Sequence, residues 1–103
     1  MKTNDSKIIV KINPELAELI PTFLKNRGTD IPTMLEALKT GDYIAIERTG
    51  HGMKGSGSGF GFDAISEIGG LIEEAAKQKN ESEVKKGIED FSNYMSRIEI
   101  IYE

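Results

Sequence analysis

The sequence predicts an all-α fold, an antiparallel four-helix bundle formed by a single domain of 103 residues. Apolar residues recur at spacings of three and four positions over most of the chain, which is the pattern of helices that bury one face. The stretches between these patterns are short, so consecutive helices are expected to run antiparallel. A chain of this length has room for one hydrophobic core. We therefore expect residues 1–103 to form one domain, with the bundle at about residues 14–98.

The first part of the chain combines a strand pattern with a helix start. Residues 7–12 (Lys-Ile-Ile-Val-Lys-Ile) are rich in β-branched side chains and predict a short strand. Residues 13–15 (Asn-Pro-Glu) are typical of the first residues of a helix. An apolar stripe follows at Leu16, Leu19, Ile20, Phe23 and Leu24. Because Pro21 lies inside this stripe and an interior proline removes a helical hydrogen bond, we expect a kink there or a helix that begins after Asn13.

Turn and capping signals divide the rest of the chain. Residues 27–29 (Arg-Gly-Thr) predict the end of the first helix, and Asp30 is the predicted cap of the second. Residues 40–42 (Thr-Gly-Asp) form the next break, and Asp63 opens a later helix. Asn80, with an acidic residue three positions later, predicts a capping box at the start of the last helix.

The last two predicted helices each have a regular apolar face, and the chain ends in a strand-like pattern. The two faces consist of Ile65, Ile68, Gly69, Ile72 and Ala76, and of Val84, Ile88, Phe91, Met95 and Ile98. Residues 97–103 alternate in polarity and predict a strand-like extension. Pairing of this extension with residues 7–12 would join the two ends of the chain.

A glycine-rich segment between these regions has two interpretations. Six of the 11 glycines lie in residues 50–61. In the first interpretation, residues 43–48 form a strand and the glycines form a loop, since Gly50-x-Gly52-x-x-Gly55 matches the dinucleotide-binding fingerprint. That fingerprint requires a βαβ unit, and no second core strand follows before the C-terminal tail. The missing strand weakens this interpretation, and a nucleotide-binding module is kept as an alternative function.

In the second interpretation the same segment is a helix with two distinct faces. The inner face consists of Ile46, Gly50, Met53, Gly57 and Phe60. The outer face consists of Glu47, His51, Lys54, Gly55 and Ser58. Each interior glycine costs about 1 kcal/mol relative to alanine, so tertiary packing has to offset the weak helix propensity. Inner glycines allow a neighbouring helix to approach closely, and outer glycines indicate that something bulky comes near the backbone.

Composition excludes several classes of site. The chain has no cysteine and a single histidine, which excludes disulfides, thiol catalysis and multi-histidine metal clusters. Its 13 basic and 17 acidic residues give a net charge of −4, which argues against non-specific binding of nucleic acid. No apolar run is long enough to cross a membrane. We expect a cytoplasmic protein that binds no metal, nucleic acid or membrane.

The segment around the histidine resembles a known family. The pattern His51-x-x-Lys54-Gly55-Ser56, followed by Phe60-Gly61 and an apolar helix that ends in acids and alanines, is similar to the histidine-containing phosphotransfer (Hpt) domain, in particular to stand-alone bacterial members. The similarity extends over about residues 14–98. The additional glycines around His51 and the strand-like ends depart from the usual family pattern.

The resemblance implies a phosphoryl carrier of a two-component phosphorelay. His51 would be the phosphoacceptor, attacking through Nε2, and Lys54 would stabilise the charge of the phosphoryl group. The implied partners are a response-regulator receiver domain, which would supply the Mg²⁺, and a hybrid histidine kinase. The chain itself would bind no cofactor and no ATP, and we expect a monomer.

Residues on or bordering the outer face of the same helix are candidates for partner contacts. They are Ile44, Glu47, Arg48, Gly52, Gly55, Ser58 and Phe62, and a core position is the alternative interpretation for Phe62. Glu47, four residues before His51, is also expected to accept the Nδ1 proton and to fix the tautomer of the ring. Glu73 and Glu74 are expected to lie on a solvated face. A helical interaction domain that no longer transfers phosphate stays open as a second alternative.

Overall fold

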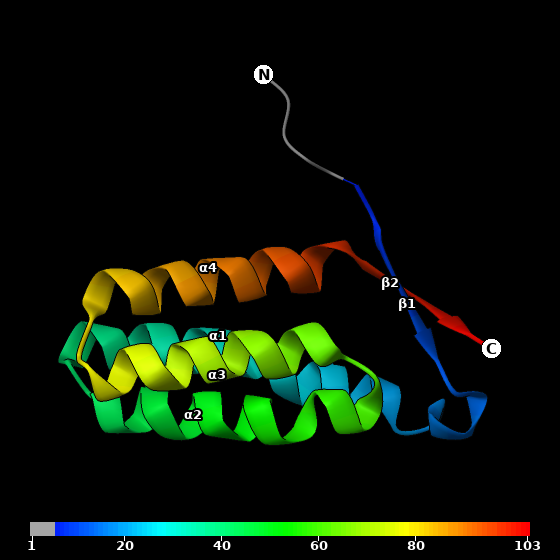
Figure 1. The fold of residues 1–103 in the computed structure, drawn as a ribbon, viewed down its shortest axis with the longest axis horizontal. Helices are drawn as coiled ribbons and strands as arrows, with labels where there is room; N and C mark the ends of the chain where they lie inside the picture. Colours follow the sequence, from blue (N-terminus) through cyan, green and yellow to red (C-terminus); the bar gives the residue numbers. More distant parts are fainter. Residues whose placement is uncertain (1–5) are drawn as a thin grey trace.

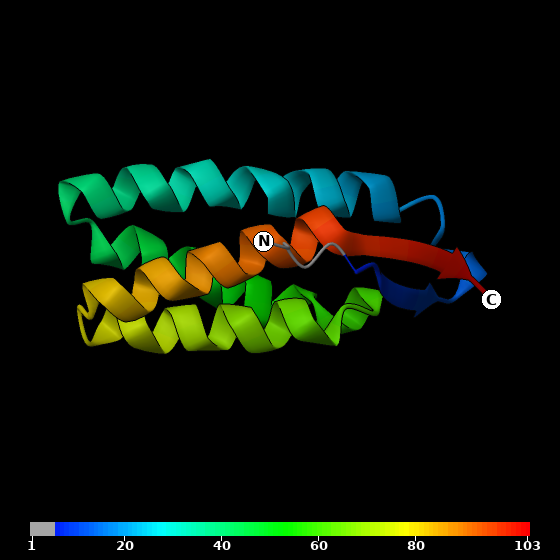
Figure 2. The ribbon, with the colours of Figure 1, turned by 90° about the horizontal axis from the view of Figure 1, so that it is seen from above.

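The computed structural model describes residues 6–103 and has the predicted all-α architecture (Figure 1). Four helices pack side by side as an antiparallel bundle, and a pair of short strands projects beyond one end of it (Figures 1 and 2). The helices are α1 (Ile20–Thr40), α2 (Tyr43–Ser56), α3 (Asp63–Lys77) and α4 (Glu81–Arg97). Two short 3-10 helices, η1 (Pro14–Leu16) and η2 (Ser58–Phe60), precede α1 and follow α2. Among the described residues, no helix is long and apolar enough to cross a membrane.

Helix α1 is continuous, so the predicted break at residues 27–29 and the predicted cap at Asp30 are wrong. The Asp30 carboxylate accepts a hydrogen bond from Nε of Arg27 at 2.7 Å instead of capping a new helix. A glycine inside a helix costs about 1 kcal/mol, which the packing of a long helix on the core can offset. The helix begins at Ile20 and has Pro21 in its first turn, where a missing N–H costs no helical hydrogen bond. The later helix start is thus confirmed, and Asn13 caps η1.

Helix α2 forms despite its glycines, so the strand-and-loop interpretation is wrong, and with it the nucleotide-binding alternative. Its first turn is capped by Asp42, whose carboxylate accepts a hydrogen bond from the Ala45 N–H at 3.1 Å. The helix ends at Ser56, earlier than the expected helical segment, and η2 and a turn complete the connection to α3. Gly61 in that turn has φ 95°, a backbone conformation that strongly favours glycine.

Helices α2 and α3 approach until their backbones touch. A Cβ atom on Gly50 would lie 2.8 Å from both the Glu73 nitrogen and the Gly69 carbonyl oxygen. A Cβ atom on Gly69 would lie 2.7 Å from the Gly50 oxygen and from the Lys54 nitrogen. Only glycine fits at these two positions. The close approach places residue 73 of α3 directly beside residue 51 of α2, and so it builds the candidate site.

The strand-like ends pair, an arrangement that the sequence allowed but did not specify. Strand β1 (Ile8–Ile12) runs parallel to β2 (Ile98–Tyr102), with Ile8 opposite Ile98 and Ile12 opposite Tyr102. Ile12 is buried against the end of the bundle, where Phe23 stacks on Phe60 and Phe62 with ring centroids 4.4 and 5.5 Å apart. Phe62 is fully buried in this cluster. The prediction that Phe62 contacts a partner is therefore wrong, because its side chain is part of the core.

Candidate functional site

The single histidine stands on the solvent side of α2. The side chain of His51 is 72% exposed, and its Nδ1 atom lies 3.0 Å from Oε2 of Glu73 on α3. Glu73, not Glu47, is therefore the hydrogen-bond partner of the ring, and the predicted role of Glu47 as acceptor of the Nδ1 proton is wrong. The prediction that Glu73 lies on a solvated face is also wrong, because its side chain is 11% exposed.

The Glu73 carboxylate is the centre of a small charge cluster. Nζ of Lys54 lies 3.7 Å from Oε1, and Nζ of Lys77 lies 4.0 Å from Oε2. Burial alone would raise the pKa of Glu73, but the hydrogen bond from His51 and the charges of His51, Lys54 and Lys77 together hold this pKa below its ordinary value of 4.5. Glu73 is thus a carboxylate at neutral pH.

This contact assigns the roles of the two ring nitrogens of His51. An ionised carboxylate only accepts hydrogen bonds, so Nδ1 is the donor and carries a proton. In the neutral ring the lone pair is then on Nε2. The arrangement leaves an exposed imidazole with its nucleophilic nitrogen free and its other nitrogen held by a negative charge.

A serine at the start of α3 forms hydrogen bonds to the last turn of α2, which contains Lys54, and to the residues that follow it. The Ser66 hydroxyl donates a hydrogen bond to the Lys54 carbonyl oxygen at 2.9 Å and accepts one from the Ser58 N–H at 2.8 Å. A helix end leaves its last carbonyl groups without helical partners, and Ser66 supplies one. This hydroxyl therefore holds the backbone of Lys54 against α3.

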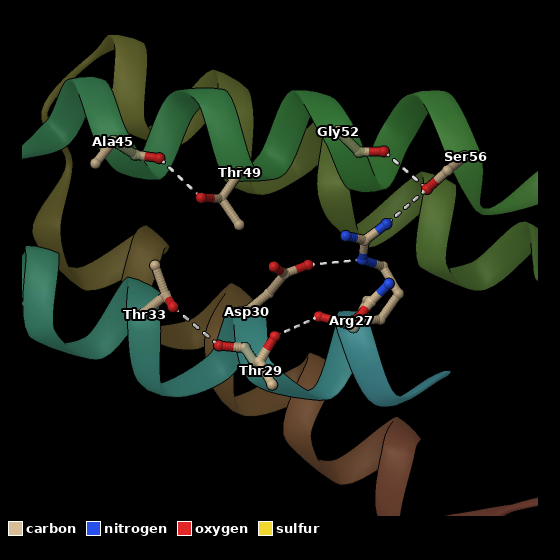
Figure 3. Close-up of polar contacts among 9 residues, drawn as sticks. Arg27, Thr29, Asp30, Thr33, Ala45, Thr49, Gly52 and Ser56 are labelled. Carbon is tan, nitrogen blue, oxygen red and sulfur yellow. Dashed lines mark hydrogen bonds and ion pairs between the residues drawn. The ribbon is translucent and has the colours of Figure 1, made fainter. Parts of the chain in front are cut away.

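A second contact fastens the same turn to α1. Arg27 donates through one terminal nitrogen to the Ser56 hydroxyl at 3.1 Å and through Nε to Asp30, while Ser56 donates to the Gly52 carbonyl oxygen at 2.9 Å (Figure 3). The ion pair of Arg27 and Asp30 is partly buried. Burial raises the pKa of Asp30, and the charge of Arg27 only partly offsets this rise. Ser56 thus points toward Arg27 on α1.

Most of the residues predicted to contact a partner lie on the accessible surface near His51. Ile44 is 63% exposed, although it is a large apolar residue. A shallow depression beside the ring is lined by Glu47, Arg48, His51 and Glu73. Gly52 and Gly55 are exposed, with no atom within 4 Å of the Cβ that either would gain, and Ser58 is exposed as well. The backbone of α2 is therefore bare next to His51. Among residues 6–103, no group of three or more metal-ligating side chains could hold a metal ion.

Two members of the charge cluster, Glu73 and Lys77, were not among the predicted site residues. One signal in the sequence points to Glu73, since it follows Gly69 by four positions and so lies beside the buried stripe of α3. An acid at such a position requires a partner, because an unpaired buried charge is costly. Lys77, four residues after Glu73, carries no comparable signal, since such pairs are common on helix surfaces.

Comparison with known proteins agrees with this geometry. The family model of the Hpt domain matches residues 18–100, which is most of the chain. Neither the curated proteins nor the solved structures gave a significant match.

Proposed function

The chain belongs to the Hpt domain family, whose members act in histidine phosphotransfer, and on that premise we propose that His51 is the residue that accepts and passes on the phosphoryl group. One observation carries this proposal. The only imidazole of the chain is exposed on α2, and a buried carboxylate holds its Nδ1 proton so that Nε2 is free to attack.

The transfer requires one bond to form and one to break. The lone pair of Nε2 attacks the phosphorus of an aspartyl phosphate, the bond between phosphorus and the aspartate oxygen breaks, and the aspartate leaves as a carboxylate. The Nδ1 proton stays on the ring, which becomes positively charged. Glu73, 3.0 Å from Nδ1, stabilises that charge as it develops. The reverse sequence returns the phosphoryl group to an aspartate.

Lys54 assists by its charge. Phosphoryl transfer depends mainly on positioning and on neutralising the oxygens of the moving group. The ammonium of Lys54 lies one helical turn after His51, its side chain is 59% exposed, and it is held loosely at 3.7 Å from Glu73. It can therefore turn from Glu73 to a phosphoryl group on Nε2.

The partners that fit this chemistry are a receiver domain and a hybrid histidine kinase. The receiver domain would supply both the phosphorylated aspartate and the Mg²⁺, since the chain needs no metal of its own for the roles assigned to His51, Lys54 and Glu73. The bare backbone at Gly52 and Gly55 gives the loops around the partner's aspartate room to approach. The exposed side chain of Ile44 and the nearby Glu47 and Arg48 would border that contact on one side of His51, and Ser58 in η2 would border it on the other.

The proposal is tested by incubating the protein with a receiver domain that carries radiolabelled phosphate. We expect the parent chain to gain phosphate that is labile in acid, and His51→Gln to gain none while unfolding at the same urea concentration. Label retained by the variant would show that another residue is the acceptor. A parent chain that gains no label from any receiver domain or kinase would support the alternative of a non-transferring interaction domain.

A further inference from the structure

The site contains one more cation than the transfer chemistry assigned so far has used. Lys77, the last residue of α3, has its Nζ atom 4.0 Å from the same Glu73 oxygen that accepts the hydrogen bond of His51. The side chain of Lys77 is 48% exposed. Its ammonium is thus close to the imidazole and, like that of Lys54, is not buried.

Charge balance favours a second cation beside the phosphorylated ring. When Nε2 of His51 carries a phosphoryl group and Nδ1 keeps its proton, the positive ring and the Glu73 carboxylate neutralise each other. The phosphoryl group carries about two negative charges. Lys54 supplies one positive charge, so one negative charge is left without a counterion.

From this juxtaposition we propose that Lys77 is a second phosphoryl-binding residue, which moves with Lys54 from Glu73 to the phosphoryl group when His51 is phosphorylated. The inference rests on the proposed function of His51. In the unmodified protein, Glu73 holds both ammonium groups within 4.0 Å, and the three charges leave a net charge of about +1 beside the ring to attract an anionic donor.

A purely structural role would give Lys77 a different signature. A lysine at the C-terminus of a helix, four residues after a glutamate, stabilises that helix slightly. Such a residue would affect unfolding slightly and the reaction of His51 not at all. The two roles are therefore separated by measuring the reaction and the stability on the same variants.

The test uses potassium phosphoramidate, a small anionic phosphoryl donor that needs no protein partner. Nε2 of His51 attacks its phosphorus, the P–N bond breaks and ammonia leaves. We expect Lys77→Gln to be phosphorylated about three- to tenfold more slowly than the parent chain. This effect is at or above the upper range of the contributions of exposed ion pairs, because the donor is an anion. Lys77→Arg should restore most of the rate. Lys85→Gln, which removes the same charge from an exposed position on α4, should react like the parent chain.

A second measurement addresses the movement directly. On phosphorylation of His51, the NMR signals of the Lys77 side-chain end should shift, and those of Lys85 should not. Equal rates for Lys77→Gln and Lys85→Gln, or an unmoved Lys77 signal, would overturn the inference. If instead the parent chain and all variants take up no phosphate at His51, the proposed function itself fails.

Discussion

The contact between α2 and α3 leaves no space for a side chain at Gly69, and this gives the strongest single test of how the site is built. In Gly69→Ala, the new Cβ would lie 2.6 Å from the Met53 Cβ and 2.7 Å from two backbone atoms, the Gly50 oxygen and the Lys54 nitrogen. None of these atoms belongs to the flexible end of a side chain. The two helices would have to move apart, and the neighbours of Gly69 cannot relieve the clash by rotating.

Two opposing terms set the size of the effect on stability. Overpacking a well-filled contact costs about 1–3 kcal/mol, and three rigid neighbours put Gly69 at the upper end of that range. Replacing a helical glycine by alanine returns about 1 kcal/mol through helix propensity. We therefore expect Gly69→Ala to lower the free energy of unfolding by about 2 kcal/mol. Gly52→Ala is the matched control, because its Cβ meets nothing within 4 Å, and it should stabilise the protein by about 0.5–1 kcal/mol.

The same movement would separate Glu73 from His51, since the backbone of Glu73 lies in this contact. Urea unfolding followed by circular dichroism measures the first effect, and phosphorylation of His51 by phosphoramidate measures the second. We expect Gly69→Ala to be slower in the reaction even under conditions where it is fully folded. If Gly69→Ala were as stable as Gly52→Ala, the backbone contact between α2 and α3 would not exist as described, and the argument for the position of Glu73 would fail.

Three further outcomes follow from individual contacts. A carboxylate whose pKa is lowered by folding stabilises the protein at pH values above its ordinary pKa. The contribution of Glu73 should therefore be present above pH 4.5 and be lost as the pH falls through the lower pKa of the folded state. An NMR titration of the Glu73 carboxyl carbon should give a pKa below 4.5, and this pKa should rise in Lys77→Gln. Asp42→Ala should lower the free energy of unfolding by about 1 kcal/mol through loss of the α2 cap, as measured by urea unfolding. Asp42→Asn should keep most of the stability that the cap provides, because asparagine also caps helices well. Ser66→Ala should cost about 1 kcal/mol and speed amide exchange at Ser58, whose N–H loses its acceptor.

The architecture was predictable because most of its helices are specified by local sequence patterns. Apolar stripes at helical spacing identified the faces of α3 and α4, and the cap at Asn80 is confirmed by its hydrogen bond with the Glu83 N–H. The predicted break in α1 failed because a glycine and a possible cap were taken as a boundary. Asp30 lies three residues after Arg27, a spacing at which two side chains of one helix can pair, so the same local sequence fits both a helix cap and an ion pair inside a continuous helix.

The candidate site was predictable only in part, for a related reason. His51 and Lys54 lie on one helix, so their spacing alone places them on the same face. The contact of His51 with Glu73 joins residues 22 positions apart in the sequence, across two helices. It depends on the distance between α2 and α3, which Gly50 and Gly69 set. Spacing suggested Glu47 as the partner of the ring because it considers one helix at a time.

The glycines of α2 have opposite consequences on its two faces, and together they explain why the site exists only in the folded bundle. On the inner face, Gly50 lets α3 come close enough for Glu73 to reach the ring, while on the outer face Gly52 and Gly55 leave the backbone bare beside it. Both features lower the helix propensity of the segment by about 1 kcal/mol per glycine. An isolated α2 peptide would thus be largely unfolded, and neither the tautomer of His51 nor the position of Lys54 would be fixed in it. Hydrogen bonds from other helices, such as those of Ser66 to the Lys54 carbonyl and of Arg27 to Ser56, therefore stabilise the helical conformation of the α2 segment that bears the reactive side chains.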